Sequence, residues 1–188
     1  MTRPSTSAPW PGHSALVVPV PELERLVRAR HEHYDPAYRS TDPRFAHAHI
    51  TVLAPFIGPD DLLKADPVIT HIASQTMAFD YELTRVATFP NGIIHVVPEP
   101  AGRFRELTAA LSRAFPRFVP YAGIFGPGPE SIVPHLTVDA VGPDVDELVV
   151  RRWVQPLMPV RARAERLQLS WYEPNACRTL RSWLLSRG

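Results

Sequence analysis

A four-residue pattern occurs twice in this chain and constrains the fold more than any other feature. The tetrad HITV begins at His49, and the tetrad HLTV begins at His135. In a β-strand, residues two apart point to the same face. Each tetrad therefore presents a histidine and a threonine on one face and two aliphatic side chains on the other. The aliphatic pair is typical of a strand that covers a hydrophobic core.

The elements predicted around the two tetrads follow one repeated order. In each half, apolar periodicity and proline positions predict strand, helix, strand, helix, strand. The predicted strands span 15–20, 48–54, 79–89, 92–97, 133–141, 165–172 and 179–185. The predicted helices span 21–31, 102–115 and 144–155, and a further one begins at Asp66 and Pro67. A shared order and a shared tetrad indicate an internal duplication, which would bring the two tetrad strands together across a pseudo-twofold axis.

Composition excludes several classes of protein. The 188 residues, 45% hydrophobic and 21% charged, fit one globular domain or two closely packed lobes. We expect a loose proline-rich tail over 1–13 and a single bilobal domain over 14–188. No apolar run reaches the ~20 residues of a membrane helix, and no signal-peptide pattern is present. Cys177 is the only cysteine, which excludes an internal disulfide and a cysteine-based zinc site.

The charge balance bears on partners. The net charge of +1 lacks the basic footprint of a duplex-binding protein. We therefore expect no duplex DNA as a partner. Because no membrane span and no signal peptide are predicted, we expect a cytoplasmic protein without a membrane as partner. We also expect a monomer.

Two imidazoles and two hydroxyls around one cleft suit phosphodiester hydrolysis. An attacking oxygen must lose a proton while a leaving oxygen gains one on the opposite side of phosphorus. Histidine, with an ordinary pKa near ~6.5, can serve either role at neutral pH. Threonine hydroxyls can donate hydrogen bonds to the non-bridging oxygens. Because imidazolium and these donors handle the charge, we expect no metal and no cofactor.

Other interpretations of the histidines stay open. A single His-x-Thr match carries little weight in a chain with 8 histidines, since half-buried strands often contain one. His47, His49 and His135 could instead form a zinc site at strand spacing, although the threonines would then be unexplained. His95 alternates with apolar residues on a predicted strand, and we expect it to be a half-buried structural residue.

A long proline- and glycine-rich loop over 116–134 leads directly into the second tetrad. Loops of this length in compact domains are often functional, so Tyr121 and Phe125 are predicted to stack on a nucleobase. The alternative is that both rings pack into the core. The candidates for a second phosphate contact are Arg85, Arg103, Arg105 and Arg151.

The segments AHITVLAPF (48–56) and VPHLTVDAV (133–141) resemble the twin signatures of the 2H phosphoesterase superfamily. This superfamily includes bacterial 2′-5′ RNA ligases and RNA 2′,3′-cyclic phosphodiesterases. The resemblance covers about 14–186 and implies an α+β fold. In that fold, two pseudo-symmetric lobes have antiparallel sheets that line a central cleft, with helices outside. It also implies that His49 and His135 are the acid/base pair and that Thr51 and Thr137 anchor phosphate.

The resulting hypothesis is a metal-independent phosphodiesterase that hydrolyses a 2′,3′-cyclic phosphate on an RNA end or a small nucleotide. One alternative keeps the site but joins RNA fragments through a 2′-5′ linkage. Another is a non-catalytic module that captures a nucleotide or an RNA end.

Overall fold

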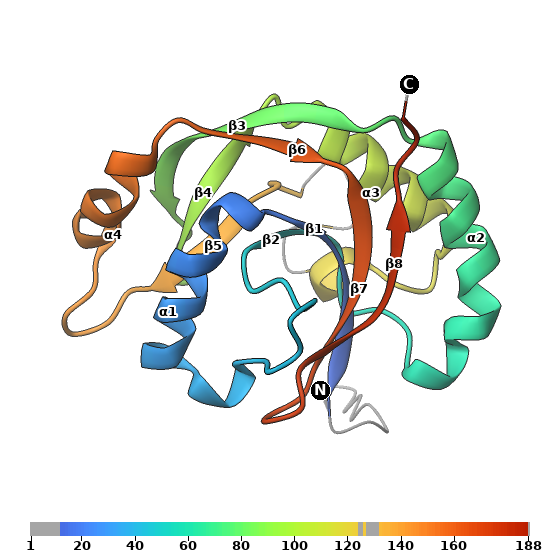
Figure 1. Ribbon diagram of the computed structural model, residues 1–188, viewed down its shortest axis with the longest axis horizontal. Coiled ribbons are helices and arrows are strands. Elements are labelled where there is room, and N and C mark those ends of the chain that lie inside the picture. Colours follow the sequence, from blue (N-terminus) through green and yellow to red (C-terminus); the bar gives the residue numbers. More distant parts are fainter. Residues whose placement is uncertain (1–11, 124–125, 127–131, 188) are drawn as a thin grey trace.

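The computed structural model describes residues 12–123, 126 and 132–187 and shows an α+β architecture (Figure 1). The strands are β1 (His13–Pro19), β2 (His49–Leu53), β3 (Phe79–Thr88), β4 (Ile93–Glu99), β5 (Leu136–Ala140), β6 (Val160–Ala164), β7 (Arg166–Tyr172) and β8 (Arg178–Leu184). The α-helices are α1 (Glu24–Tyr34), α2 (Leu62–Gln75), α3 (Gly102–Ala114) and α4 (Glu147–Val154). None of the helices in the described part of the chain is long and apolar enough to cross a membrane.

All strand pairs are antiparallel, in the order β6-β3-β4-β5-β2-β1-β7-β8. The two tetrad strands, β2 and β5, lie at the centre, so each half of the sheet contains four strands. The halves meet where Ile50 pairs with Leu136. The predicted fold class is confirmed, with the refinement that the two expected sheets are joined here into one curled sheet.

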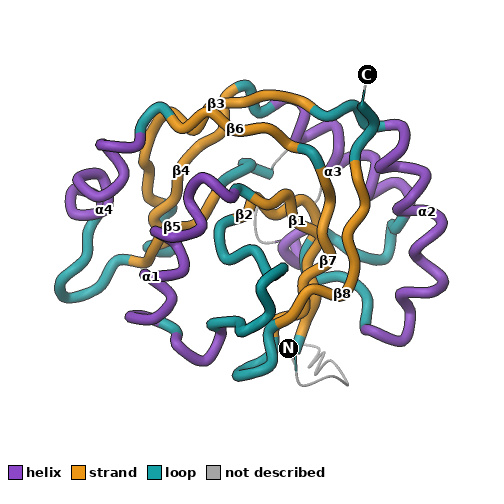
Figure 2. Tube along the Cα trace, in the orientation of Figure 1, coloured by secondary structure: helices purple, strands orange, loops and turns teal. Residues whose placement is uncertain are grey.

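The helices lie in two pairs at opposite ends of the molecule. Helices α1 and α4 contact β5 and β3, whereas α3 and α2 contact β2 and β8. In Figure 1 the first pair is at the left and the second at the right, and β3 and β6 arch over the top; Figure 2 shows the same separation by colour. Each half of the sheet thus has two helices of its own.

Strand alternation places the core on one face of β2. Ile50 and Val52 are buried, whereas His49 and Thr51 are half-buried. The same alternation buries Leu136 and Val138 on β5. Both tetrads therefore turn their aliphatic side chains into the core, which leaves their histidines and threonines on the other face.

The element boundaries differ from the sequence prediction most clearly at β6, at α2 and at the N-terminal tail. Strand β6 was not predicted, because its VRARA sequence buries only one valine and two alanines. Helix α2 begins at Leu62 rather than Asp66, so Pro67 lies inside it. Proline has no N–H to donate to the carbonyl four residues earlier, which belongs to Leu63, a residue that is 87% exposed. Of the predicted tail, residues 1–11 lie outside the described part, and His13 already belongs to β1, where it pairs with Tyr172.

Candidate active site

The two tetrads lie side by side in antiparallel register. Ile50 of the first tetrad pairs with Leu136 of the second. In an antiparallel pair this register sets His49 opposite Thr137 and Thr51 opposite His135. Diagonal neighbours across such a pair are about 7–8 Å apart, within reach of aromatic side chains. The register therefore brings both histidines and both threonines onto one small area of one sheet face.

Matched β-bulges show that the two halves are built alike around this area. On β1, Val17 pairs with Thr51, and the register shifts before Leu16 pairs with Leu53. On β4, His95 pairs with Thr137, and the register shifts before Ile94 pairs with Asp139. Each bulge falls directly after the threonine of its tetrad. A local twofold through the Ile50–Leu136 pair thus relates the two halves of the site.

His49 is held at both ring nitrogens. Its Nδ1 lies 3.0 Å from the carbonyl oxygen of Ala46, and its Nε2 lies 3.2 Å from the hydroxyl of Tyr172. A carbonyl can only accept, so Nδ1 carries the proton and Nε2 accepts from the hydroxyl. Burial of the ring lowers the pKa of His49 to about 4, against the opposing effect of the Ala46 hydrogen bond. His49 is therefore a neutral base at neutral pH in the free protein.

His135 has the same tautomer in a different setting. Its Nδ1 donates to the carbonyl oxygen of Val133 at 2.7 Å, which leaves Nε2 as the basic nitrogen. The ring stacks against Tyr121 at 5.8 Å and meets the edge of His95 at 5.3 Å, measured between ring centroids. Burial lowers the pKa of His135 as well. Two neutral imidazoles with matching tautomers thus lie side by side, one at the start of β2 and one directly before β5.

Thr51 and Thr137 are half-buried on the histidine face, so their hydroxyls can reach a bound anion. Tyr121 lies beside both tetrads, because it stacks on His135 and its hydroxyl is close to Thr51. Burial raises the pKa of Tyr121 to about 12, partly offset by Thr51. Tyr121 also has a positive φ of 51°. The predicted partner Phe125 lies outside the described residues.

Three aromatic residues of this area were not predicted as site residues. Tyr172 bonds His49, His95 meets His135, and Phe89 stacks on His95 at 3.8 Å. His95 is buried, close to the half-buried structural role expected from its alternation. Tyr172 had a usable signal, since it ends a strand whose polar residues alternate with Leu167, Leu169 and Trp171.

His47 lies apart from this arrangement, contrary to the zinc-site alternative. Its Nδ1 is 2.6 Å from a Glu24 carboxylate oxygen, and its Nε2 accepts from the backbone N–H of Ser40 at 3.0 Å. Both nitrogens are therefore used within the protein. Across the described residues, no group of three or more histidine, cysteine or acidic side chains is arranged to hold a metal ion.

Three of the four candidate arginines pair with carboxylates. Arg85 lies 3.9 Å from Glu99, Arg103 lies 3.3 Å from Glu106, and Arg151 lies 2.7 Å from Glu147. Arg105 is exposed on α3. None of these contacts brings an arginine to a tetrad residue.

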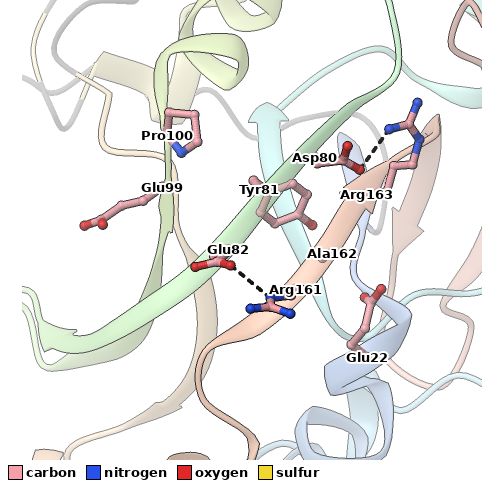
Figure 3. Close-up of a pocket in the computed structure, with 9 residues that line it drawn as sticks. All are labelled: Glu22, Asp80, Tyr81, Glu82, Glu99, Pro100, Arg161, Ala162 and Arg163. Atoms are coloured by element: carbon pink, nitrogen blue, oxygen red, sulfur yellow. Dashed lines mark hydrogen bonds and ion pairs between the residues drawn. The ribbon is translucent and has the colours of Figure 1, made fainter.

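A pocket of about 670 Å³ beside β3 and β6 lacks all four tetrad residues (Figure 3). Its charged lining residues are Glu22, Asp80, Glu82, Glu99, Arg161 and Arg163. Both guanidinium groups already pair, Arg161 with Glu82 at 3.1 Å and Arg163 with Asp80 at 2.8 Å. The excess of carboxylates makes this pocket unfavourable for a phosphate.

Family models give an independent comparison. The model of the 2'-5' RNA ligase superfamily matches residues 18–176, well over half of the chain. The chain belongs to this superfamily. The family resemblance drawn from the two tetrads is thereby confirmed. The comparison with curated proteins finds no match.

Solved structures of this fold are similar over nearly the whole chain. Escherichia coli LigT complexed with 3'-AMP superposes with a TM-score of 0.60 at 14% identity, covering 95% of this chain and 100% of LigT. The Thermus thermophilus protein TT0787 gives a TM-score of 0.58 at 21% identity, covering 93% of this chain and 98% of that protein. At these identities the likeness establishes the shared 2H phosphoesterase fold.

Proposed function

We propose that this chain is a metal-independent phosphodiesterase that opens a 2′,3′-cyclic phosphate. The observation that carries the proposal is the register of the two tetrads, with Ile50 opposite Leu136. With this register, the imidazoles of His49 and His135 lie on the same face of the sheet, and each has a threonine of the other tetrad opposite it. The two imidazoles also have the same tautomer. A phosphate between them would have a proton acceptor on one side and a proton donor on the other.

In the proposed step, a water oxygen attacks phosphorus, and the basic Nε2 of one histidine takes its proton. The bond from phosphorus to one ribose oxygen breaks, and the second histidine, entering as imidazolium, gives its proton to that oxygen. Thr51 and Thr137 donate to the non-bridging oxygens, where negative charge grows. The product is a phosphate monoester, and proton exchange with solvent resets both rings.

One imidazole must be protonated for this step, although both have a lowered pKa in the free protein. A bound phosphate anion favours the charged form of a neighbouring imidazole. Substrate binding would therefore raise the pKa of one ring, and the other would stay neutral as the base. Such a pair predicts a bell-shaped pH profile.

The ligands of a relative support the substrate class. Crystal structures of LigT are described as complexes with 3'-AMP, with ATP and with NADP+. Each of these molecules carries phosphate on a ribose. A ribose phosphate is accordingly the class of substrate that we propose for this chain.

The direct test is turnover of 2′,3′-cyclic nucleotides and cyclic-phosphate RNA oligomers by His49→Ala and His135→Ala. Each change should lower kcat by about 10²–10⁴, the usual contribution of one proton transfer. His71→Ala, at an exposed position on α2, is the matched control and should retain activity. Activity should survive a chelator. Undiminished turnover in both site variants would refute the proposal.

Reversible 2′-5′ ligation at the same site is the second candidate. The near-symmetric pair of histidines favours it, since the ring that gives a proton in one direction takes it in the other. Incubation with one fragment ending in a cyclic phosphate and another beginning with a 5′-hydroxyl should then yield joined product. Tight nucleotide binding with neither hydrolysis nor joining would instead support a non-catalytic binding module.

A further inference from the structure

Strand β7 extends the histidine face beyond the tetrads. Residues two apart on a strand share a face, and on β7 one such set is Arg166, Gln168, Ser170 and Tyr172. The Tyr172 hydroxyl reaches Nε2 of His49, which identifies this face as the one that carries the tetrad histidines. Arg166 therefore lies on the same side of the sheet as His49.

A groove of about 650 Å³ opens along this part of the face. Its lining includes Arg166 and Gln168 on one side and the segment from Pro43 to Ala46 on the other. Gln168 donates from Nε2 to the carbonyl oxygen of Arg44 at 3.0 Å. The carbonyl of Ala46 in the same segment accepts from His49. One wall of the groove is thus the segment that orients the first tetrad histidine.

Strand register gives the separation between this groove and the tetrads. Gln168 on β7 pairs with Val17 on β1, and Val17 pairs with Thr51 on β2. The three residues form one row across neighbouring strands. Two strand spacings amount to about 10 Å, so the groove begins within a nucleotide or two of a phosphate held by Thr51.

Within the described part of the chain, the groove contains one arginine without a carboxylate partner, Arg166. Its charged lining residues are Arg44, Arg163, Arg166, Arg181, Glu24 and Glu165. Of these, Arg44, Arg163 and Arg181 pair with Asp42, Asp80 and Asp66. Glu24 already accepts from His47 and from the backbone N–H of Ala48, so its charge is partly used. Arg166 is exposed and makes no hydrogen bond or ion pair with the described residues. A polyanion could engage it without displacing a protein carboxylate.

We propose that this groove binds the phosphodiester backbone of a single-stranded RNA whose cyclic end lies between His49 and His135. The inference rests on the proposed function and narrows it, because a free cyclic nucleotide would leave the groove unused. Arg166 would contact a phosphate upstream of the reacting one. Guanidinium groups suit this task, since their planar fork matches phosphate oxygens.

The test compares Arg166→Gln and Arg44→Gln with Arg113→Gln, a matched control at an exposed position on α3 outside the groove. Each protein is assayed on a 2′,3′-cyclic mononucleotide and on an RNA oligomer with a cyclic-phosphate end. The ratio of kcat/KM for the oligomer to kcat/KM for the mononucleotide should fall about fivefold in each groove variant, the effect of one exposed ion pair. Arg113→Gln should keep the wild-type ratio.

Salt dependence gives a second readout that does not need turnover. The fluorescence anisotropy of a labelled RNA oligomer measures affinity against salt, and each lost phosphate contact should reduce the slope of log K against log salt by about 0.7. A reduced slope in Arg166→Gln supports RNA binding in the groove even if no substrate is hydrolysed. The test of the groove is thereby independent of the test of the proposed reaction. An unchanged slope with an unchanged substrate ratio, or equal losses on both substrates, would overturn the proposal.

Discussion

The hydroxyl of Tyr172 lies 3.2 Å from Nε2 of His49, the nitrogen that the proposed reaction requires. Burial raises the pKa of this phenol, so it remains a donor throughout the neutral range. In the proposed reaction, a water molecule or a ribose oxygen takes the position that this hydroxyl occupies in the free protein. On that proposal, Tyr172 fixes the His49 tautomer before substrate arrives and yields its hydrogen bond when substrate binds.

Replacing Tyr172 with phenylalanine should raise the pKa of His49, because the hydrogen bond that the hydroxyl donates to Nε2 stabilises the neutral ring and is broken when Nε2 takes a proton. The acidic limb of the kcat/KM profile should therefore move to higher pH. Loss of this orienting hydrogen bond, about 1 kcal/mol, should lower kcat about fivefold. A pH–rate profile measures both effects. Tyr38→Phe, outside the tetrads, is the control, and an acidic limb that stays in place would contradict the assigned role.

Thr51→Val and Thr137→Val should each lower kcat by about 10²–10³, the effect of losing one donor to a developing oxyanion. The local twofold predicts losses of similar size, and serine at either position should restore most of the rate. Steady-state kinetics with a cyclic nucleotide test this. Thr84→Val is a suitable control, since the buried Thr84 hydroxyl has no hydrogen-bond partner in the described structure. A normal rate in Thr51→Val would exclude a phosphate contact there.

The sequence predicted the centre of the site better than its surroundings. The two tetrads carry their own strand pattern, so the faces of His49 and Thr51 followed from alternation alone. The inferred internal duplication was enough to predict that the two tetrad strands lie together, because it relates equivalent strands by a pseudo-twofold axis. Strand β6 escaped prediction because alanine and arginine give almost no hydrophobic signal.

Contacts between distant segments could not be predicted from local pattern. Tyr172 reaches His49 only because β7 lies next to β1, which in turn lies next to β2. The bond from Glu24 to His47, which removes His47 from the site, likewise joins a helix to a loop. Periodicity predicts which way a side chain points, whereas strand order decides which partner it meets.

Stability should fall as the pH drops below neutral. Burial lowers the pKa of His49 and of His95 to about 4, so the unfolded chain binds protons before the folded chain does. Their stabilising contribution is complete above the ordinary histidine pKa of ~6.5 and is lost as the pH falls toward about 4. Urea unfolding between pH 7.5 and 4 should show this slope. His95→Phe should flatten it, whereas His71→Gln, at an exposed position, should not; equal slopes in all three proteins would contradict the assignment.

A buried ion pair joins Arg30 on α1 to Asp139 on β5, at a position where the first half of the sheet has an apolar residue, Leu53 on β2. Asp139 corresponds through the matched bulges to Leu53, and its carboxylate lies 2.5 Å from Nε of Arg30 with 2% of the side chain exposed. Arg30 also lies 4.3 Å from the ring centroid of Trp153. The second half therefore ties α1 to β5 by charge at a position where the first half uses a leucine.

Asp139→Leu should destabilise the fold by about 3–5 kcal/mol, because it leaves the Arg30 charge buried without a partner. The double variant Arg30→Leu with Asp139→Leu should recover most of that loss, since two apolar side chains bury no charge. Urea unfolding of the single and double variants measures the coupling. The exposed pair of Arg103 and Glu106 is the control, and Glu106→Ala should change stability by less than about 1 kcal/mol. If the double variant instead loses as much unfolding free energy as the two single variants together, the two charges do not compensate each other. Leu53 of the first half would then not be the equivalent of the ion pair.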